Sequence, residues 1–332
     1  MRYVIYGAGG IGGVIGGWLH HAGREVVLIA RGAHHEAIRE RGLRIDHPQG
    51  TITVPTPVVD HPSRLDWRGD EVVFLTMKTQ DTLPALNDLA AAVGALDVPI
   101  VCAQNAVENE RLALRLFPRV YGLCVMLPAT YLDPGVVWSH GEPVHGILDL
   151  GRYPEGADDV AALVAADLEA AGFRSQADPR IMRQKYSKLV TNLINAVDAA
   201  CGPAGRESVL LKRARAEALE VLAAAGIDVA SPAEDAARRG EFRIRSADGQ
   251  KHRGSSAWQS LARGLGTIET NYFNGEIVLL GRLHGVPTPV NALLQRVAAE
   301  LARTGAPPGS RTPEQLEAML EGAPASPRGA DG

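Results

Sequence analysis

Residues 2–12 decide the fold, and they read Arg2-Tyr3-Val4-Ile5-Tyr6-Gly7-Ala8-Gly9-Gly10-Ile11-Gly12. The apolar run over 2–6 is typical of a buried parallel strand, and an apolar helix pattern follows over 11–22. Between them the glycines have the G-x-G-x-x-G spacing. The first glycine allows a tight turn, the second lets a pyrophosphate approach the backbone, and the third lets the helix pack on the strand. Because free N–H groups and the helix dipole can hold an anion there, the sequence predicts a dinucleotide site at Gly7, Gly9, Gly10, Ile11 and Gly12.

The second predicted strand, over 25–31, ends in Arg31. A site that prefers NAD normally has an acidic residue here, which binds the 2′-hydroxyl of the adenosine ribose. A guanidinium can instead bind a 2′-phosphate through two hydrogen bonds. We therefore predict a preference for NADP over NAD; the alternative is that Arg31 is a solvated charge at a strand end.

Composition limits the class of protein. The length of 332 residues favours two domains, and 45% hydrophobic with 22% charged residues is ordinary for a globular protein. A net charge of -4 and a pI near 6.2 give no electrostatic footprint for nucleic acid or for an anionic membrane. No apolar run has the length of a membrane span, and the N-terminus carries the glycine motif instead of a signal peptide. Since the three cysteines form no C-x-x-C pair, we expect a cytoplasmic protein whose partners are small molecules.

Strand and helix patterns alternate through the first half of the chain. Strands are predicted over 71–78 and 98–103, a hairpin or loop with short strands over 43–59, and helices over 33–41, 83–93 and 158–171; the segment 119–153 is strand-rich, and 173–177 is a last short strand. The fold class is therefore α/β, with a Rossmann-type doubly wound sheet over 1–177. A mostly α-helical domain is expected over 178–305. A partly disordered tail over 306–332 includes one brief helical pattern near 313–321.

Two polar residues stand at the ends of successive predicted strands, Lys78 and Asn105. By residue type alone they could be a surface charge and a turn residue. Ligands of doubly wound sheets, however, bind outside the carboxyl ends of the strands. We therefore favour cofactor or substrate contact for both.

The helical region contains a polar stripe. Lys188, Asn192 and Asn195 are spaced i, i+4 and i+7, so one predicted helix would carry them on one face. Buried without partners they would cost several kcal/mol, so they either pair inside the protein or line a cleft, where they would supply one proton donor and two amides. Further on, Ser255 and Ser256 could bind a substrate or cap a helix, and Glu269 lies in the first turn of a helix predicted over 267–284.

Taken in order, these motifs resemble the ketopantoate reductase family, and the resemblance spans roughly residues 1–300. It implies a two-domain, NADPH-dependent reductase that converts 2-dehydropantoate to D-pantoate in pantothenate and coenzyme A synthesis. Lys188 would be the general acid, with Glu269 as the carboxylate that interacts with it. By the same resemblance Asn192, Asn195 and Ser256 look like substrate contacts, with Ser255 grouped beside them, and Lys78 and Asn105 look like cofactor-side residues.

Some positions depart from the family pattern. Gln104-Asn105-Ala106 replaces Gln-Asn-Gly, Arg253 stands where some members carry asparagine, and the spacing from Ser256 to Glu269 is one residue longer. The acid that is reduced is therefore less well defined than the chemistry. One alternative to a ketopantoate reductase is a reductase of another branched 2-oxo or imino acid. A second is a non-catalytic NADP-binding sensor. No metal site is expected, and the oligomeric state stays open, with a homodimer as one alternative.

Overall fold

The computed structural model describes residues 1–131, 133–245, 254–264 and 266–321. The chain divides into two compact units, Met1–Lys188 with Val229–Lys251, and Leu189–Asp228 with His252–Gly332. The predicted class, a Rossmann-type sheet followed by a helical region, is confirmed. The units do not divide at the predicted junction near 177, where the strand-like runs stop, but at 188/189, inside a helix. Residues 229–251 also belong to the first unit.

The first unit is built on one seven-stranded sheet in the order β12-β8-β7-β6-β1-β2-β5. All neighbours pair in parallel except β12, which is antiparallel to β8. The chain leaves β1 for β2 on one side and returns to β6 on the other, so the topological switch point lies between β1 and β6. The strands are β1 (Arg2–Tyr6), β2 (Glu25–Ile29), β5 (Val58–Val59), β6 (Glu71–Leu75), β7 (Ile100–Cys102), β8 (Val120–Met126) and β12 (Ile147–Arg152).

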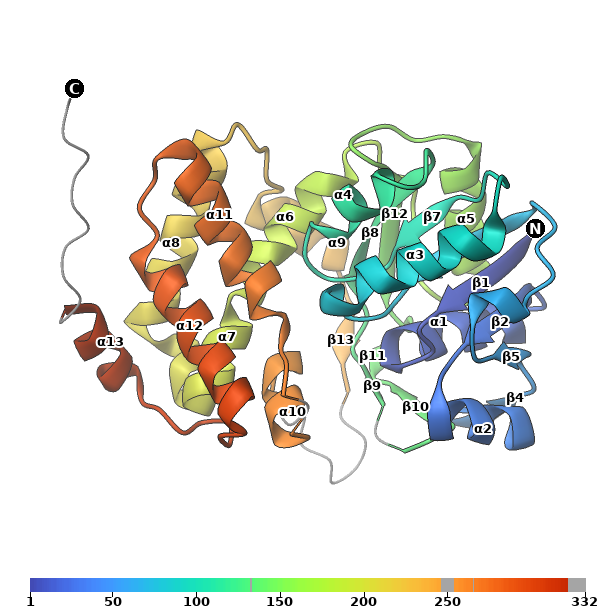
Figure 1. Cartoon of the computed structure of the whole chain (residues 1–332), viewed down its shortest axis with the longest axis horizontal. Coiled ribbons are helices and arrows are strands. Elements are labelled where there is room, and N and C mark those ends of the chain that lie inside the picture. Colours follow the sequence, from blue (N-terminus) through green and yellow to red (C-terminus); the bar gives the residue numbers. More distant parts are fainter. Residues whose placement is uncertain (132, 246–253, 265, 322–332) are drawn as a thin grey trace. The chain divides into compact units, whose positions relative to one another are not determined.

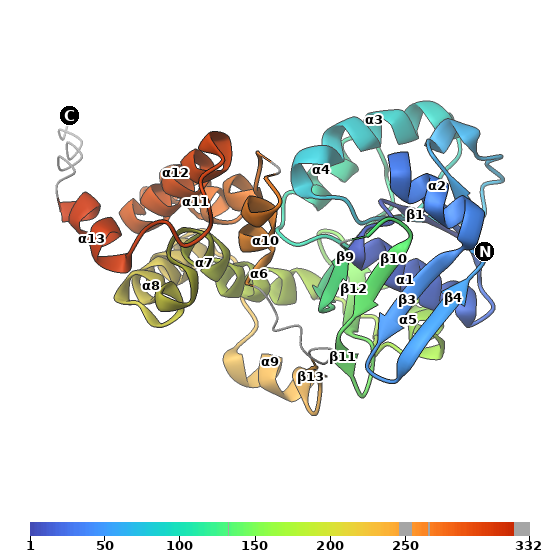
Figure 2. The same cartoon turned by 90° about the horizontal axis from the view of Figure 1, so that it is seen from below.

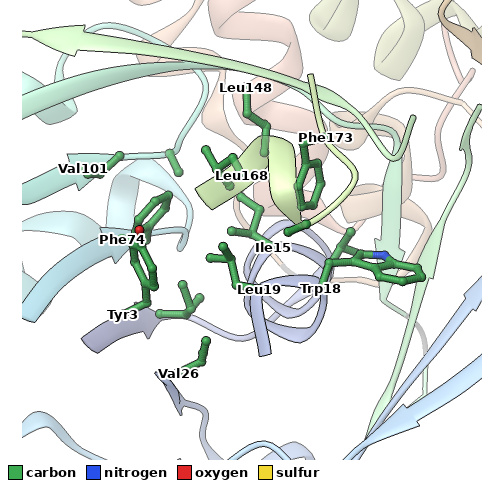
Figure 3. Packing of buried hydrophobic residues seen from close by; sticks show 14 of the residues in the cluster. Tyr3, Ile15, Trp18, Leu19, Val26, Phe74, Val101, Leu148, Leu168 and Phe173 are labelled. Atoms are coloured by element: carbon green, nitrogen blue, oxygen red, sulfur yellow. The ribbon is translucent and has the colours of Figure 1, made fainter. Parts of the chain in front are cut away.

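Helices cover both faces of this sheet (Figure 1). Alternate residues of β1 separate the two cores: Tyr3 and Ile5 pack with α1 (Gly10–His21) and α5 (Asp159–Ala170), whereas Val4 packs with α3 (Thr82–Val93) and α4 (Asn109–Leu114). Figure 3 shows the first of these cores, where side chains of α1 and α5 meet those of the sheet. Buried on both faces, the strands are almost continuously apolar.

A smaller sheet, in the order β4-β3-β10-β9, packs on the other side of α1 (Figure 2). Its strands are β3 (Leu43–His47), β4 (Gly50–Val54), β9 (Ala129–Tyr131) and β10 (Val136–Ser139), so the hairpin predicted within 43–59 is confirmed. β11 (Gly141–Glu142) pairs with β13 (Arg243–Ile244), a short strand inside the region predicted to be helical. The strand predicted over 173–177 is wrong as a regular element, because this segment makes only isolated bridges to β12.

Glycines let α1 fit between the two sheets. A Cβ at Gly16 would lie 2.6 Å from a methyl of Leu28 in the main sheet, and a Cβ at Gly17 would lie 2.4 Å from a methyl of Ile45 in the small sheet. Real Cβ atoms do not approach so closely, so both contacts depend on the missing side chains. On two faces of α1, the helix backbone itself therefore contacts side chains of the sheets.

The remaining helices complete the chain. α2 (Gly32–Arg41) follows β2, α9 (Pro232–Arg239) belongs to the first unit, and α6 (Ile181–Asn192) carries the chain into the second. The second unit contains α7 (Ile194–Cys201), α8 (Val209–Ala224), α10 (Ser256–Ala262), α11 (Asn274–His284), α12 (Pro289–Thr304) and α13 (Pro313–Glu321). The helical pattern predicted near 313–321 is thus confirmed. Short 3₁₀ turns are η1 (Pro62–Arg64), η2 (Thr79–Asp81), η3 (Gly202–Glu207) and η4 (Glu269–Tyr272). None of the helices that the structure describes is long and apolar enough to cross a membrane.

A stacked histidine lies where α1 meets the small sheet. The ring of His145 stacks on Trp18 with centroids 3.8 Å apart, and His47 lies edge-on to both rings. Burial, together with the neighbouring His47 and His21, lowers the pKa of His145 to about 4. The folded protein therefore keeps this ring neutral in a range where an unfolded chain would protonate it.

This difference predicts an acid-sensitive fold. An unfolded histidine has a pKa of about 6.5, so between about pH 6.5 and 4 the unfolded state binds a proton that the folded state lacks, and stability falls with pH by on the order of 2 kcal/mol. In His145→Phe, which keeps a stacking ring, urea unfolding at pH 7.5 and 4.5 should show a smaller loss than in the unmodified protein. His284→Gln, at an exposed site on α11, is the control. An identical loss in His145→Phe would contradict the assignment.

Candidate active site

The glycine turn between β1 and α1 has the geometry that a dinucleotide requires. Gly7 has φ +109°, and a Cβ there would lie 2.9 Å from the Met77 nitrogen. A Cβ at Gly12 would lie 2.4 Å from the Gly7 carbonyl oxygen, so the third glycine is needed for helix–strand contact. At Gly9 a Cβ would meet nothing within 4 Å. Since the first amides of a helix have no acceptor within it, those of Gly10, Ile11 and Gly12 remain available to an anion beside this open backbone.

The end of β6 is tied directly to this turn. The Thr76 hydroxyl donates to the Gly7 carbonyl oxygen at 2.7 Å, and the Thr76 amide donates to the Tyr6 carbonyl oxygen at 3.0 Å. Lys78 follows two residues later at the start of η2, half-buried. It therefore lies beside the switch point between β1 and β6, at the sheet edge where ligands of this fold bind.

Arg31 stands at the carboxyl end of the next strand. It follows β2, precedes α2 as its N-cap residue with extended backbone, and is exposed. The neighbouring strands β1 and β2 pair in parallel, so the guanidinium and the glycine turn belong to the same edge of the sheet. A residue there can reach the adenosine side of a dinucleotide.

A buried polar network shapes the loop after β7. The Gln104 side-chain amide donates to the Met77 carbonyl oxygen at 3.0 Å and to the Thr82 hydroxyl at 2.7 Å. Asn109 accepts from Thr82 at 2.8 Å and donates to the Asn105 carbonyl oxygen at 3.0 Å. The side-chain oxygen of Asn105 is buried and has no hydrogen-bond partner among the described residues. A buried acceptor without a partner is costly, and it marks a place where a ligand would be stabilised.

Lys188 shares a small cavity with this loop. The cavity is lined by residues 104–106 after β7, residues 123–125 of β8, Lys185 and Lys188, all of the first unit. Burial lowers the pKa of Lys188; Arg239 and Lys185 act in the same direction, whereas Cys124 and Asp235 oppose them. A desolvated ammonium with a lowered pKa gives up its proton more readily than a solvated lysine does.

The polar stripe predicted on one helix is wrong in part. Lys188 and Asn192 lie on α6, but this helix ends at Asn192, and Asn195 lies on α7. At Leu193 the amide bonds to the Val190 carbonyl three residues back, so a tighter turn interrupts the α-helical phase. Asn195 is buried, and the side-chain nitrogen of Asn192 has no hydrogen-bond partner in the described part of the chain.

The serine pair and Glu269 belong to the second unit. Ser255 caps α10 by accepting from the Trp258 amide at 3.2 Å, and its own amide donates to buried Asp198 at 2.6 Å. Ser256, the first residue of α10, is exposed. Arg253 lies outside the described residues.

The helix predicted over 267–284 is wrong in its first third. Glu269 begins the 3₁₀ turn η4, and α11 starts only at Asn274. The Asn274 side chain bonds to Thr270 at 3.4 Å and to Asn291 at 3.0 Å. Such side-chain bonds compete with helical continuation, and Glu269 therefore precedes the helix.

Sequence reasoning missed Lys185 and Glu110. These two residues form an ion pair at 2.5 Å between α6 and α4, with side chains 2% and 0% exposed. The only signal in the sequence was that Lys185 precedes Lys188 by three residues and so shares its helix face. Nothing in the sequence connects it to a carboxylate 75 positions earlier.

Two family models match the chain. The one described as ketopantoate reductase PanE/ApbA matches residues 3–155, and the one described as ketopantoate reductase PanE/ApbA C terminal matches residues 180–302. The 2-dehydropantoate 2-reductase of Archaeoglobus fulgidus is 31% identical over 89% of this chain and 95% of its own length. That of Halobacterium salinarum is 30% identical over 91% and 98%.

Solved structures show the same fold. The PanE/ApbA family ketopantoate reductase from Ralstonia eutropha is 28% identical with a TM-score of 0.78, covering 92% of this chain and 99% of that chain. D-mandelate dehydrogenase with NADH and anilino(oxo)acetate reaches a TM-score of 0.77 over 92% and 99%, at 23% identity. At that identity the likeness concerns the fold alone.

Ala106 gives a prediction about the loop itself. It is the one non-glycine residue with positive φ, +67°, in the part of the chain that the structure describes. A left-handed residue with a Cβ costs about 1–2 kcal/mol. Ala106→Gly removes this strain but loses a buried methyl and gains unfolded-state entropy, so the opposing effects nearly cancel and we expect the free energy of unfolding in urea to change by less than about 1 kcal/mol. Ala103→Gly, equally buried without positive φ, should instead destabilise; a larger loss at Ala106 than at Ala103 would contradict the strain argument.

Proposed function

Because this chain belongs to the ketopantoate reductase family, and is an oxidoreductase of a class that uses a nicotinamide cofactor, we propose that it reduces a 2-oxo acid to a 2-hydroxy acid with NADPH. The leading substrate is 2-dehydropantoate, with D-pantoate as product, in pantothenate and coenzyme A biosynthesis. The observation that carries the proposal is the desolvated ammonium of Lys188 in one cavity with Asn105. That cavity lies at the carboxyl end of the sheet that also carries the glycine turn.

In this proposal Lys188 is the general acid. When bound, NADPH supplies the hydride to the substrate carbonyl carbon. Lys188 polarises the carbonyl oxygen with its positive charge and then gives it a proton. Glu269 is assigned by the family resemblance as the carboxylate that keeps the lysine charged.

The substrate contacts follow from the family resemblance. That resemblance assigns Asn192, Asn195 and Ser256 to the substrate. Ser255, the N-cap residue of α10, is added because its hydroxyl could also bind the substrate. Amides and hydroxyls can donate to a carboxylate and accept from a hydroxyl group, which a branched 2-oxo acid and its product require. We also propose that the enzyme acts in the cytoplasm, with a homodimer as one alternative for its oligomeric state.

The cofactor contacts are proposed from the geometry of the glycine turn and from the family resemblance. The amides of Gly10, Ile11 and Gly12 hold the pyrophosphate beside the open backbone of Gly9, and Arg31 binds the 2′-phosphate. By the family resemblance, Lys78 and Asn105 contact the cofactor.

The central experiment measures NADPH oxidation with a panel of 2-oxo acids that includes ketopantoate. Lys188→Ala should lower kcat by about 10²–10⁴-fold if the lysine is the acid. Lys212→Ala, an exposed lysine on α8, should leave kcat unchanged. In the unmodified enzyme kcat should fall at alkaline pH as Lys188 loses its proton, below the ordinary lysine pKa of about 10.4.

Each outcome separates the candidates. Preference for another acid of the panel would keep the reductase and change the substrate. An unchanged rate in Lys188→Ala would remove the lysine from the mechanism. If no 2-oxo acid is reduced although NADPH binds, the chain is a non-catalytic NADP-binding sensor, which needs the glycine turn and Arg31 but not Lys188.

Cofactor choice is tested at Arg31. A bidentate charge-assisted contact is worth about 1.5–3 kcal/mol, so Arg31→Ala should weaken NADPH binding roughly 10–100-fold and leave NADH binding nearly unchanged. Arg41→Ala, in the exposed last turn of α2, is the matched control. Titration by fluorescence gives both dissociation constants, and equal affinities for the two cofactors in the unmodified protein would refute the preference.

A further inference from the structure

Lys185 is the buried cation at the centre of the candidate active site. Its ammonium donates to the carbonyl oxygens of Gln104 at 2.9 Å, Cys102 at 3.3 Å and Leu123 at 3.3 Å. These acceptors come from the end of β7, the loop after it and β8. One side chain on α6 therefore fixes the helix to two adjacent strands.

Glu110 on α4 completes the arrangement. It pairs with Lys185 at 2.5 Å, and both side chains are almost fully excluded from solvent. A buried ion pair is weak evidence for a stabilising role, because apolar residues of similar volume often replace such pairs without loss. The position of this pair, however, is not arbitrary. Gln104 directly precedes Asn105, and Lys185 lies one helical turn before Lys188.

We propose that Lys185 is a positioning residue of the reductase. Its bonds to the β7 loop and to β8 hold the Lys188 ammonium and the Asn105 amide at a fixed separation across their shared cavity, and Glu110 neutralises its charge. The inference rests on the proposed role of Lys188 as general acid. It goes beyond that role because a second lysine, which does not react, sets the position of the Lys188 ammonium.

The charge of Lys185 gives the inference a signature that packing alone lacks. Burial is the main cause that lowers the pKa of Lys188; Arg239 on α9 and Lys185 lower it further, whereas Cys124 on β8 and Asp235 on α9 raise it. Removing the Lys185 charge should raise the pKa of Lys188. Removing only the Glu110 carboxylate leaves Lys185 uncompensated and should lower it.

The test uses the full-length enzyme and three variants. Lys185→Met/Glu110→Gln removes both charges without leaving one buried alone. Glu110→Gln keeps the three carbonyl bonds of Lys185, and Lys185→Arg keeps its charge. The control is Arg2→Met/Glu71→Gln, a buried pair at the amino end of the same sheet. For each protein kcat, KM, the pH profile of kcat and the melting temperature are measured.

We expect kcat of the double variant to fall about 10–100-fold, as misplacement of a catalytic group does, with KM changed less than kcat. Its alkaline limb should stay near that of the unmodified enzyme, because a cation and an anion are lost together, whereas the limb of Glu110→Gln, in which the Lys185 charge is left uncompensated, should move down. Lys185→Arg should keep the limb of the unmodified enzyme. The control pair should lower the melting temperature without moving kcat more than twofold.

Two results would overturn the inference. If Lys188→Ala is inactive while the double variant keeps kcat and the limb of Glu110→Gln does not move, Lys185 is merely structural and the proposed function survives. If Lys188→Ala is fully active, the proposed function fails and the inference fails with it. If the double variant does not fold, the two single variants decide. A shifted alkaline limb in Glu110→Gln together with an unshifted one in Lys185→Arg supports the inference. Unshifted limbs in both variants refute the inference.

Discussion

The close approach of α1 to two sheets at once is the constraint on which the first unit depends. Gly12 and Gly16 face the main sheet and Gly13 and Gly17 face the small one, with no space for a Cβ at any of the four. Because the helix is held at backbone distance, its first amides end beside β1 and β6, at the switch point of the sheet. The same close packing therefore also positions the amides that the proposed function assigns to the pyrophosphate.

Polar residues of the candidate site follow the carboxyl ends of several strands along this edge of the sheet. Three of the parallel strands are each followed by a polar residue at this edge: Arg31 after β2, Lys78 after β6 and Asn105 after β7. The cost of placing polar groups there is offset by a connected network, in which Gln104 and Asn109 satisfy the backbone of the loops. The Asn105 side-chain oxygen, which has no hydrogen-bond partner among the described residues, belongs to a residue that lines the cavity.

Periodicity predicted the regular elements well and the interruptions poorly. The strand over 2–6 and the helix after it lie within one residue of the predicted bounds, because buried strands and amphipathic helices leave a local pattern. The breaks after Asn192 and before Asn274 depend on a tightened turn and on side-chain bonds to Asn291, which the local pattern does not contain. The same holds for Lys185 and Glu110, since a buried pair between distant segments has no local signature. Candidate residues could be predicted from their type and strand-end position, but not the contacts that hold them.

The left-handed backbone at Ala106 shows how the network and the site are joined. Such strain persists only where the surroundings determine the conformation from several sides. Here the preceding residues are held by Lys185 at the Gln104 carbonyl and by Asn109 at the Asn105 carbonyl. A glycine at position 106 would adopt this left-handed conformation without such contacts. Because alanine adopts it only at a cost in free energy, this chain depends on the contacts made by Lys185 and Asn109. These contacts fix the backbone of the loop from within the protein, so the proposed binding of a cofactor at Asn105 would not have to order that backbone at the expense of binding energy.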